Sequence, residues 1–527
     1  MRGLVALVLS ASVGAMAPSF AQQAGTPQSC AAQVGAVLDD IRARDLDTTD
    51  GPPLNAFVAL NESALAQAAE LDRKVEQGGA KGPLHCLPVA VKDNFDTADM
   101  PVTVGSRALI GNRPPSDAPL VARMRQAGAI IVGKTNMDEF AMGIRGLSGA
   151  TGRTGNAYDT RFNSGGSSAG SGAAVGAGFV PLALGSDNCG SLRIPAVYNG
   201  AVSLRPTYGR FPIEGVFPIG FVNGVSGAIG KDVAMLRRSL AVMDERWDGK
   251  SADANDGLRG KRIGVLRTYN GKDFWAKASP EMKMQMTQAI ARMKDAGAVI
   301  VDPVVLNGFN DRLGIAFLNG FAVKVDREFS RYEGPRRTWR DVCRSGLIRP
   351  EWTERQCVAD GASAPRRERS AVRRIAANRD LMVRLMNRLK LDAIVYPTDL
   401  RGGAREDASD DITCYLAGSS GLPAAAAPAG TDSRGMPVGI EWLGRPGADE
   451  QLVAMMAAFE KARGPLAAAK RGSGQPALAK IPIPEQNQLR LSIGERAFKS
   501  RKGTALGDLE AWRFRALTDA VVRSLAP

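Results

Sequence analysis

Residues 164–175 read Ser164-Gly-Gly-Ser-Ser-Ala-Gly-Ser-Gly-Ala-Ala-Val175, a glycine- and serine-rich turn that enters a helix-forming run. Downstream, the apolar run 179–184 predicts a strand, and it is followed by Gly185-Ser-Asp-Asn-Cys-Gly-Ser-Leu-Arg-Ile-Pro195. Upstream, residues 89–94 read Val-Ala-Val-Lys-Asp-Asn and place Lys92 at the end of another strand-like run. Helices that alternate with short apolar strands are typical of an α/β protein.

The rest of the chain continues this alternation. Ser279 followed by Pro280 is typical of a helix start, because serine caps the free N–H groups and proline suits the first helical position. The expected helices follow Ser116-Asp117 to about Gln126, run from Pro280 to about Lys294, and span Asp449 to Ala462; the expected strands are 129–132, 298–301 and 391–396. Residues 306–385 are rich in arginine and are expected to be helical. We therefore expect a mixed β-sheet core covered on both faces by helices.

Composition excludes several classes of site. The chain has 527 residues and a net charge of +14, but acidic residues are interleaved with the basic ones throughout. No zinc-finger or RNA-binding aromatic motif accompanies the basic residues, so we expect solvated surfaces and no nucleic-acid partner. His85 is the single histidine, which rules out a two-histidine metal site within one chain. A Ser-His-Asp mechanism would have to use His85.

The cysteines indicate an oxidising compartment without fixing a disulfide pattern. The six are Cys30, Cys86, Cys189, Cys343, Cys357 and Cys414. Six cysteines allow fifteen full pairings, and the sequence does not choose among them. Cys343 and Cys357 are close enough to close a small loop, which makes them one predicted pair. No C-x-x-C motif occurs, so neither a redox motif nor a zinc ribbon is indicated.

The N-terminus is typical of a signal peptide over residues 1–21. Arg2 supplies the positive charge, Leu4 to Met16 is apolar, and Ser19-Phe-Ala21 offers small residues for cleavage after Ala21. The apolar stretch is too short for a spanning helix, so we expect a periplasmic or secreted protein with no stable membrane insertion. The main domain then covers 22–464. A basic extension, 465–527, follows it, with a helical piece near 508–522.

Two motif matches are rejected on their context. Gly128-Ala-Ile-Ile-Val-Gly-Lys-Thr135 matches the P-loop pattern, but its four middle residues are strand-forming and follow a helix, whereas a P-loop needs a loop there. Gly166-Ser-Ser-Ala-Gly170 matches the nucleophile elbow, with Ser168 as nucleophile. That class of hydrolase needs a histidine downstream, and His85 lies upstream.

The segments together resemble the amidase signature family of serine hydrolases. Four segments carry the resemblance: GPLHCLPVAVKDN (82–94), GAIIVGKTNMDEFAMG (128–143), SGGSSAGSG (164–172) and DNCGSLRIP (187–195). The resemblance covers roughly residues 35–240 and resumes at about 391–462. The separation of Ser167 and Ser191 agrees with the family spacing. The resemblance implies an α/β/α fold, amide hydrolysis, and no metal or organic cofactor.

The resemblance implies a Ser-cisSer-Lys relay. Ser191 would attack the carbonyl carbon, Ser167 would pass its proton on, and Lys92 would be the base. The Gly166–Ser167 peptide would be cis, and the backbone N–H groups of Asn188, Cys189, Gly190 and Ser191 would form the oxyanion hole. The chemistry is reasonable without the family name, because burial lowers the pKa of a lysine by up to ~3–5 units and so provides a neutral base.

Further residues take roles from the same resemblance. Ala141 and Met142 match positions that line the substrate pocket in the family. Asp187 and Arg193 look like supports of the nucleophile loop, although either could equally belong to a structural ion pair. His85 and the Asp138-Glu139 pair are interpreted as structural. Cys189 stands where the family usually has glycine, so it could narrow the pocket, react with thiol reagents, or be strained if that position needs a positive φ.

The sequence therefore predicts an exported amidase that acts on a small-molecule carboxamide through a Ser191 acyl-enzyme. An esterase using the same site is one alternative, and a catalytically idle basic binding protein is another. The family also includes subunits of a tRNA-dependent amidotransferase, and the predicted signal peptide argues against that role. A homodimer is left open.

Overall fold

The structure is a computed structural model that describes residues 29–217, 222–247, 256–273, 275–311, 321–349, 357, 364–401 and 412–466. The predicted signal peptide (1–21) and the predicted helical piece near 508–522 lie outside these ranges, as does all but the start of the extension 465–527. Within the described ranges, no helix is both long enough and apolar enough to cross a membrane.

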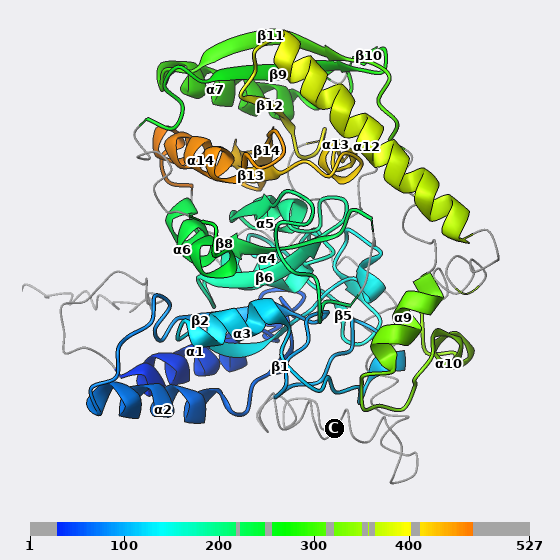
Figure 1. Cartoon of the computed structure of the whole chain (residues 1–527). Coiled ribbons are helices and arrows are strands. Elements are labelled where there is room, and N and C mark those ends of the chain that lie inside the picture. The colour runs from blue at the N-terminus through cyan, green and yellow to red at the C-terminus, as the bar shows by residue number, and fades with distance from the viewer. Residues whose placement is uncertain are drawn as a thin grey trace, which may run out of the picture.

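A twelve-stranded sheet forms the centre of the described chain, and a two-strand hairpin lies apart from it. The strand order is β1-β3-β2-β6-β8-β7-β13-β14-β12-β9-β10, and β11 pairs with β9 (Figure 1). The strands are β1 (Phe57–Leu60), β2 (Pro88–Lys92), β3 (Ile130–Thr135), β4 (Leu147–Ser148), β5 (Gly152–Arg153), β6 (Leu182–Asp187), β7 (Val202–Arg205), β8 (Val225–Gly230), β9 (Arg262–Tyr269), β10 (Lys272–Asp273), β11 (Val299–Leu306), β12 (Ala393–Pro397), β13 (Ala424–Thr431) and β14 (Pro437–Leu443). Parallel pairs join β3, β2 and β6, and antiparallel pairs run from β6 to β12. The predicted mixed sheet is confirmed.

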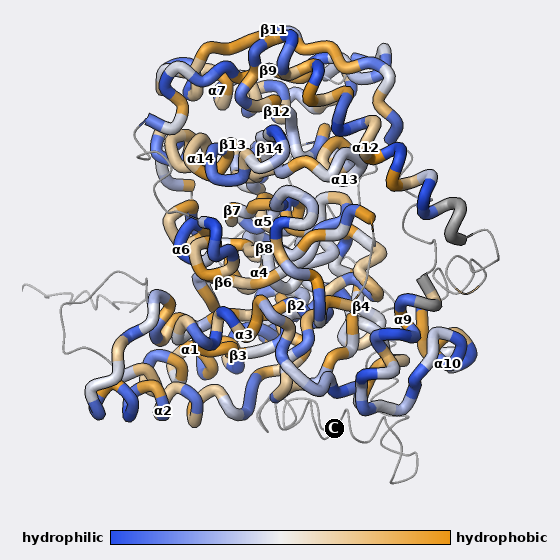
Figure 2. The backbone as a smooth tube through the Cα atoms, in the orientation of Figure 1, coloured by the Kyte–Doolittle hydropathy of each residue, from blue (hydrophilic) through white to orange (hydrophobic). Residues whose placement is uncertain are grey.

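Helices cover both faces of this sheet, and two of the helices, α9 and α10, pack together to one side of it (Figure 1). They are α1 (Cys30–Arg44), α2 (Ala64–Glu76), α3 (Pro119–Gln126), α4 (Ala169–Gly176), α5 (Arg193–Tyr198), α6 (Val233–Met243), α7 (Pro280–Asp295), α9 (Phe321–Phe329), α10 (Trp339–Arg344), α12 (Ala364–Arg388), α13 (Tyr415–Gly418) and α14 (Asp449–Arg463). Side chains alternate along β2: Val89 and Val91 belong to the buried apolar cluster that includes residues of α3 and α6, whereas Ala90 belongs to the cluster that includes residues of α1 and α4. Figure 2 shows the apolar segments along the sheet and hydrophilic segments on outer helices such as α10 and α12.

Most predicted elements appear with shifted ends. The helix expected after Ser279 is α7, and the Ser279 hydroxyl accepts the N–H of Met282 as a cap. The strand expected at 129–132 is β3, which continues through Thr135 because Gly133 and Lys134 pair with β1. The P-loop look-alike is thus strand, as its apolar middle residues predict. The arginine-rich region 306–385 contains α9, α10 and most of α12.

Three disulfides join the six cysteines in the described residues. The pairs are Cys30–Cys86, Cys189–Cys414 and Cys343–Cys357. The predicted pair Cys343–Cys357 is confirmed, with 14 residues of sequence separation. The other two pairs have sequence separations of 56 and 225 residues, over which the sequence alone does not predict disulfide pairing.

Candidate active site

Two neighbouring parallel strands end at the site. Lys92 is the last residue of β2, and Asp187 is the last residue of β6. Because β2 and β6 are parallel, their carboxyl ends meet at one edge of the sheet, where ligands bind in open α/β sheets. His85 precedes β2, so the length of the strand, roughly 15 Å, separates it from Lys92. The interpretation of His85 as a structural residue agrees with this position.

Lys92 is fully buried among hydroxyl groups. Its Nζ lies 2.8 Å from Ser167 Oγ and 2.9 Å from Ser186 Oγ. The Ser186 oxygen also accepts a hydrogen bond from the Asn94 side-chain amide at 3.1 Å. Burial lowers the pKa of Lys92 to about 7, against the opposing charges of Asp138 and Asp187. A substantial fraction of this lysine is therefore neutral near neutral pH.

Ser167 is held in a crowded turn. The Gly166–Ser167 peptide bond is cis, as the resemblance implied. Helix α4 follows directly and packs on β2, β3 and β6. A side-chain carbon at Gly170 would lie 2.1 Å from the carbonyl oxygen of Ala56, and one at Gly172 would lie 2.4 Å from that of Pro195. Only glycine allows α4 to approach its neighbours this closely, which explains the glycine-rich motif.

Ser191 lies near Ser167, although the two hydroxyl groups are not hydrogen-bonded in this structure. Ser191 precedes α5 and is 6% exposed. Its carbonyl oxygen accepts the N–H of Ser168 at 3.2 Å, which places the two segments side by side. Its hydroxyl group forms no hydrogen bond with any residue in the described part of the chain. The hydroxyl is thus unengaged.

The segment Asn188–Ser191, named here the oxyanion loop, follows β6. The Asp187 carboxylate accepts the N–H of Gly190 at 2.9 Å and that of Leu192 at 3.1 Å. The N–H of Gly190 is therefore engaged, although the resemblance counted it among four oxyanion donors. The N–H groups of Asn188, Cys189 and Ser191 have no hydrogen-bond partner among the described residues, so three of the four stay available.

A buried network of charges supports this loop. Arg193 Nε lies 3.1 Å and Arg205 Nη1 lies 3.0 Å from the Asp187 carboxylate, and Arg193 also pairs with Glu441 of β14. All four side chains are fully buried. Burial opposes ionisation of Asp187, but the two arginines outweigh it and hold the pKa of that carboxyl well below its usual range. Asp187 therefore stays ionised and keeps the loop in place.

Sequence reasoning missed Ser186, Arg205 and Glu441. Glu441 stands inside the otherwise apolar strand β14, and Arg205 ends the short buried strand β7; a charge in a buried strand indicates a partner. That signal was available in the sequence. Ser186 carried no comparable signal, because a serine near a strand end is common.

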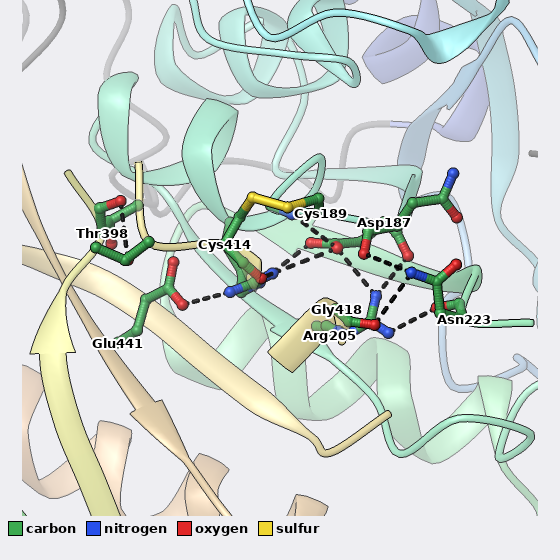
Figure 3. The surroundings of a disulfide bond; sticks show 12 residues. Asp187, Cys189, Arg205, Asn223, Thr398, Cys414, Gly418 and Glu441 are labelled. Atoms are coloured by element: carbon green, nitrogen blue, oxygen red, sulfur yellow. Dashed lines mark hydrogen bonds and ion pairs between the residues drawn. A yellow bond between two sulfur atoms is a disulfide. The ribbon is translucent and has the colours of Figure 1, made fainter. Parts of the chain in front are cut away.

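Cys189 differs from its expected behaviour in two ways. It is bonded to Cys414, so it offers no free thiol to reagents (Figure 3). Its backbone does not take a positive φ; the positive value, +86°, falls on Gly190. The expected thiol reactivity is therefore wrong, because the disulfide uses the sulfur, and the condition stated for strain, a positive φ at Cys189, is not met.

A family profile described as Amidase matches residues 49–453. The chain belongs to the amidase signature family. A glutamyl-tRNA(Gln) amidotransferase subunit from Symbiobacterium thermophilum is 33% identical over 446 residues, which cover 78% of this chain and 90% of that protein. The native peptide amidase from Stenotrophomonas maltophilia superposes with a TM-score of 0.73 at 32% identity, covering 82% and 93% of the two chains. An amidase family protein from Bacillus anthracis superposes with a TM-score of 0.72 at 26% identity, and the match covers 83% of this chain and 88% of that one.

In this amidase-family chain, Ala141 and Met142 follow Asp138, a residue that is hydrogen-bonded to the turn around Ser167. The N–H of Asp138 donates to the Ser167 carbonyl, and its carboxylate accepts three N–H groups from residues 145–147. Ala141 is the last residue of a short 3-10 turn (Glu139–Ala141), Met142 follows that turn, and both residues are half-buried. Neither residue forms a hydrogen bond with Ser191 in the part of the chain that the structure describes. The Asp138 carboxylate thus orders residues 145–147, and its carbonyl oxygen accepts the N–H of Ala141 at 2.8 Å.

One trio of metal-ligand residue types comes together in the described residues: Cys30, Asp72 and Cys86. Its two sulfur atoms are joined in a disulfide, and the Asp72 carboxylate accepts the N–H groups of Cys30 and Ala31 at the start of α1. The trio therefore fits a helix cap better than a metal site.

Proposed function

We propose that the chain is an exported amidase that hydrolyses a carboxamide through a covalent acyl-enzyme on Ser191. The observation that carries the proposal is the buried Lys92, whose pKa is lowered to about 7 and whose nitrogen lies 2.8 Å from Ser167 Oγ. A buried amine near its pKa is a suitable general base at neutral pH. Membership of the amidase family supports an amide as the bond that is cleaved.

The proposed relay starts from neutral Lys92. One of its N–H bonds donates to Ser186 Oγ, and its lone pair accepts the proton of Ser167. Ser167 in turn takes the proton of Ser191, whose oxygen attacks the amide carbon. The free N–H groups of Asn188, Cys189 and Ser191 are candidates to stabilise the developing oxyanion, and one such donor is worth ~2.7–4 kcal/mol in the transition state.

Breakdown of the tetrahedral intermediate reverses the proton path. The leaving nitrogen takes the proton through Ser167 and departs as ammonia or an amine, which leaves an ester on Ser191. A water molecule then attacks the ester, and its proton passes through Ser167 to Lys92. When the second tetrahedral intermediate collapses, the bond to Ser191 breaks, the proton returns through Ser167 to the Ser191 oxygen, and the carboxylic acid leaves. Water is the one co-reactant besides the amide that these steps need.

Export is part of the proposal. The N-terminal pattern Arg2, Leu4–Met16 and Ala21 is typical of a signal peptide, and three disulfides suit an oxidising compartment. Expression with the native N-terminus, followed by intact-mass analysis of the periplasmic protein, tests it. A mature chain that begins at Gln22 is expected. A full-length chain retained in the cytoplasm would contradict it.

The curated relatives raise another role, within a glutamyl-tRNA(Gln) amidotransferase. Three disulfides are unusual in the reducing compartment where tRNA is charged, and they favour the exported hydrolase. The similarity to a peptide amidase suggests peptide amides for the first substrate screen. An esterase and an idle basic binding protein stay alternatives.

The test is covalent labelling of the mature protein with a fluorophosphonate beside Ser191→Ala. One adduct on the wild type and none on the variant is the expected result, and ammonia release from amides should be lost in the same variant. Retained turnover in pure Ser191→Ala protein would overturn the mechanism. Absence of labelling in folded wild-type protein would favour the binding-protein alternative.

A further inference from the structure

The disulfide Cys189–Cys414 lies inside the oxyanion loop. Cys189 is two residues before Ser191, and the bond joins it to the N-terminal cap residue of α13, 225 residues later. Figure 3 shows the pair beside Asp187, Arg205 and Asn223. The other two disulfides lie outside this loop.

Cys189 depends on this bond for its position. The neighbouring parts of the loop are held by hydrogen bonds: Gly190 N–H donates to the Asp187 carboxylate, and Arg205 Nη1 donates to the Asp187 carbonyl at 2.5 Å. Cys189 itself makes no hydrogen bond with any residue that the structure describes. The Cys189 N–H is a candidate oxyanion donor. Its orientation therefore depends on the disulfide bond to Cys414.

Cys414 is a firm anchor for that link. It is buried, and its carbonyl oxygen accepts hydrogen bonds from Arg193 Nη2 at 3.3 Å and from Gly418 N at 3.1 Å. Arg193 also binds Asp187, so one guanidinium ties both sides of the disulfide together. Gly418 allows α13 to lie directly against the oxyanion loop, because a side-chain carbon at this position would lie 2.4 Å from the carbonyl oxygen of Asn188.

We propose that the Cys189–Cys414 disulfide is a positioning element that holds the Cys189 N–H in the oxyanion hole. The inference rests on the proposed function. A donor stabilises a transition state only if it is already oriented, because ordering a loop during the reaction costs conformational entropy. Complete loss of one donor lowers kcat ~10²–10³-fold, so a displaced donor should cost about tenfold or more.

Three variants test the bond itself: Cys189→Ala, Cys414→Ala and the double substitution. The readout is the second-order rate of fluorophosphonate labelling of Ser191, which needs no known substrate. Each variant should label about tenfold or more slowly, and the double variant should match the singles, because either change breaks the same bond. The pH midpoint of labelling should stay at the wild-type value, since Lys92 is hydrogen-bonded to Ser167 and Ser186, which lie outside the oxyanion loop.

The matched control is Cys30→Ala/Cys86→Ala, which removes a disulfide that ties α1 to the segment before β2. It should label at the wild-type rate when assayed below its Tm. Wild-type labelling rates in the loop variants would overturn the proposal, and so would a loss accompanied by a shifted pH midpoint. Failure of the wild type itself to label would instead overturn the proposed function.

A second measurement avoids variants that fail to fold. Native wild-type protein is treated with dithiothreitol for increasing times, and peptide mapping after alkylation gives the reduced fraction of each pair. The labelling rate should fall in proportion to reduced Cys189–Cys414. A rate that follows another pair, or none, would contradict the positioning role.

Discussion

Nζ of Lys92 lies 2.8 Å from Oγ of Ser167, and neither side chain is exposed to solvent. Burial of an ammonium group without a directly paired carboxylate is unfavourable, so the amine loses its proton more readily than a surface lysine does. The negative charges of Asp138 and Asp187 oppose this effect on the pKa of Lys92 without cancelling it. In the proposed mechanism, this lysine is the base that accepts the proton of Ser167.

The pH dependence of labelling should report this lysine. Since Lys92 acts as a base only when neutral, the labelling rate should fall about tenfold per pH unit below about pH 7 and level off above it. The measurement is a labelling series from pH 5 to 9 with stability checked at each pH. A midpoint near the ordinary lysine value would show that burial does not set the reactivity.

Lys92→Met should separate activity from stability. Methionine keeps the apolar stem but removes the base, so labelling should fall by ~10²–10⁴-fold while the protein stays folded. In the wild type, the unfolded state binds a proton between about pH 7 and the ordinary lysine pKa, whereas the folded state does not. The free energy of unfolding of the wild type, relative to Lys92→Met, should therefore rise with pH across that window.

Urea unfolding of both proteins at pH 7 and pH 9 checks the sign. The slope from this one group can reach at most about 1.4 kcal/mol per pH unit. A difference between the two proteins that is flat with pH would contradict the lowered pKa, even if the activity of the variant is lost.

Arg193→Lys should be strongly destabilising. The guanidinium donates to Asp187, Glu441 and the Cys414 carbonyl, and a lysine ammonium cannot reach all three. Breaking a buried ion pair costs about 3–5 kcal/mol, because a charge stays buried without its partner. Arg73→Lys is the control, since its pair with Glu70 is exposed. Thermal unfolding should show a large drop in Tm for the first variant and almost none for the second; equal drops would count against the network.

Gly170→Ala and Gly35→Ala should have opposite effects although both lie inside helices. The new carbon at position 170 would meet the Ala56 carbonyl oxygen at 2.1 Å, whereas at position 35 it meets Leu65 at an ordinary 3.6 Å. Alanine otherwise favours a helix over glycine by about 1 kcal/mol. In denaturant unfolding, the free energy of unfolding of Gly35→Ala should thus be higher than that of the wild type, and that of Gly170→Ala should be much lower. A stable Gly170→Ala protein would refute the close packing of α4.

The sequence predicted the local pieces of the site better than its long-range contacts. Lys92 at a strand end and Ser167 in a glycine-rich turn are local patterns, and the parallel pairing of β2 and β6 brings them to one edge. Glu441 reaches Arg193 across 248 residues, and Cys414 reaches Cys189 across 225. Such pairings depend on the order of strands in the sheet, which hydrophobic periodicity does not specify. The ends of β3 were missed for the same reason, since its last residues are strand only because β1 pairs with them.

The contact between Arg193 and Glu441 also sets the order in which the site can be completed during synthesis. Lys92, Ser167, Ser191 and Asp187 all leave the ribosome within the first two hundred residues, but Asp187 faces both Arg193 and Arg205, and the second carboxylate beside Arg193 arrives only with β14. Until then the network holds two arginines against one carboxylate. A fragment that ends before residue 441 therefore contains the three residues of the proposed relay and yet leaves one buried arginine without a balancing charge.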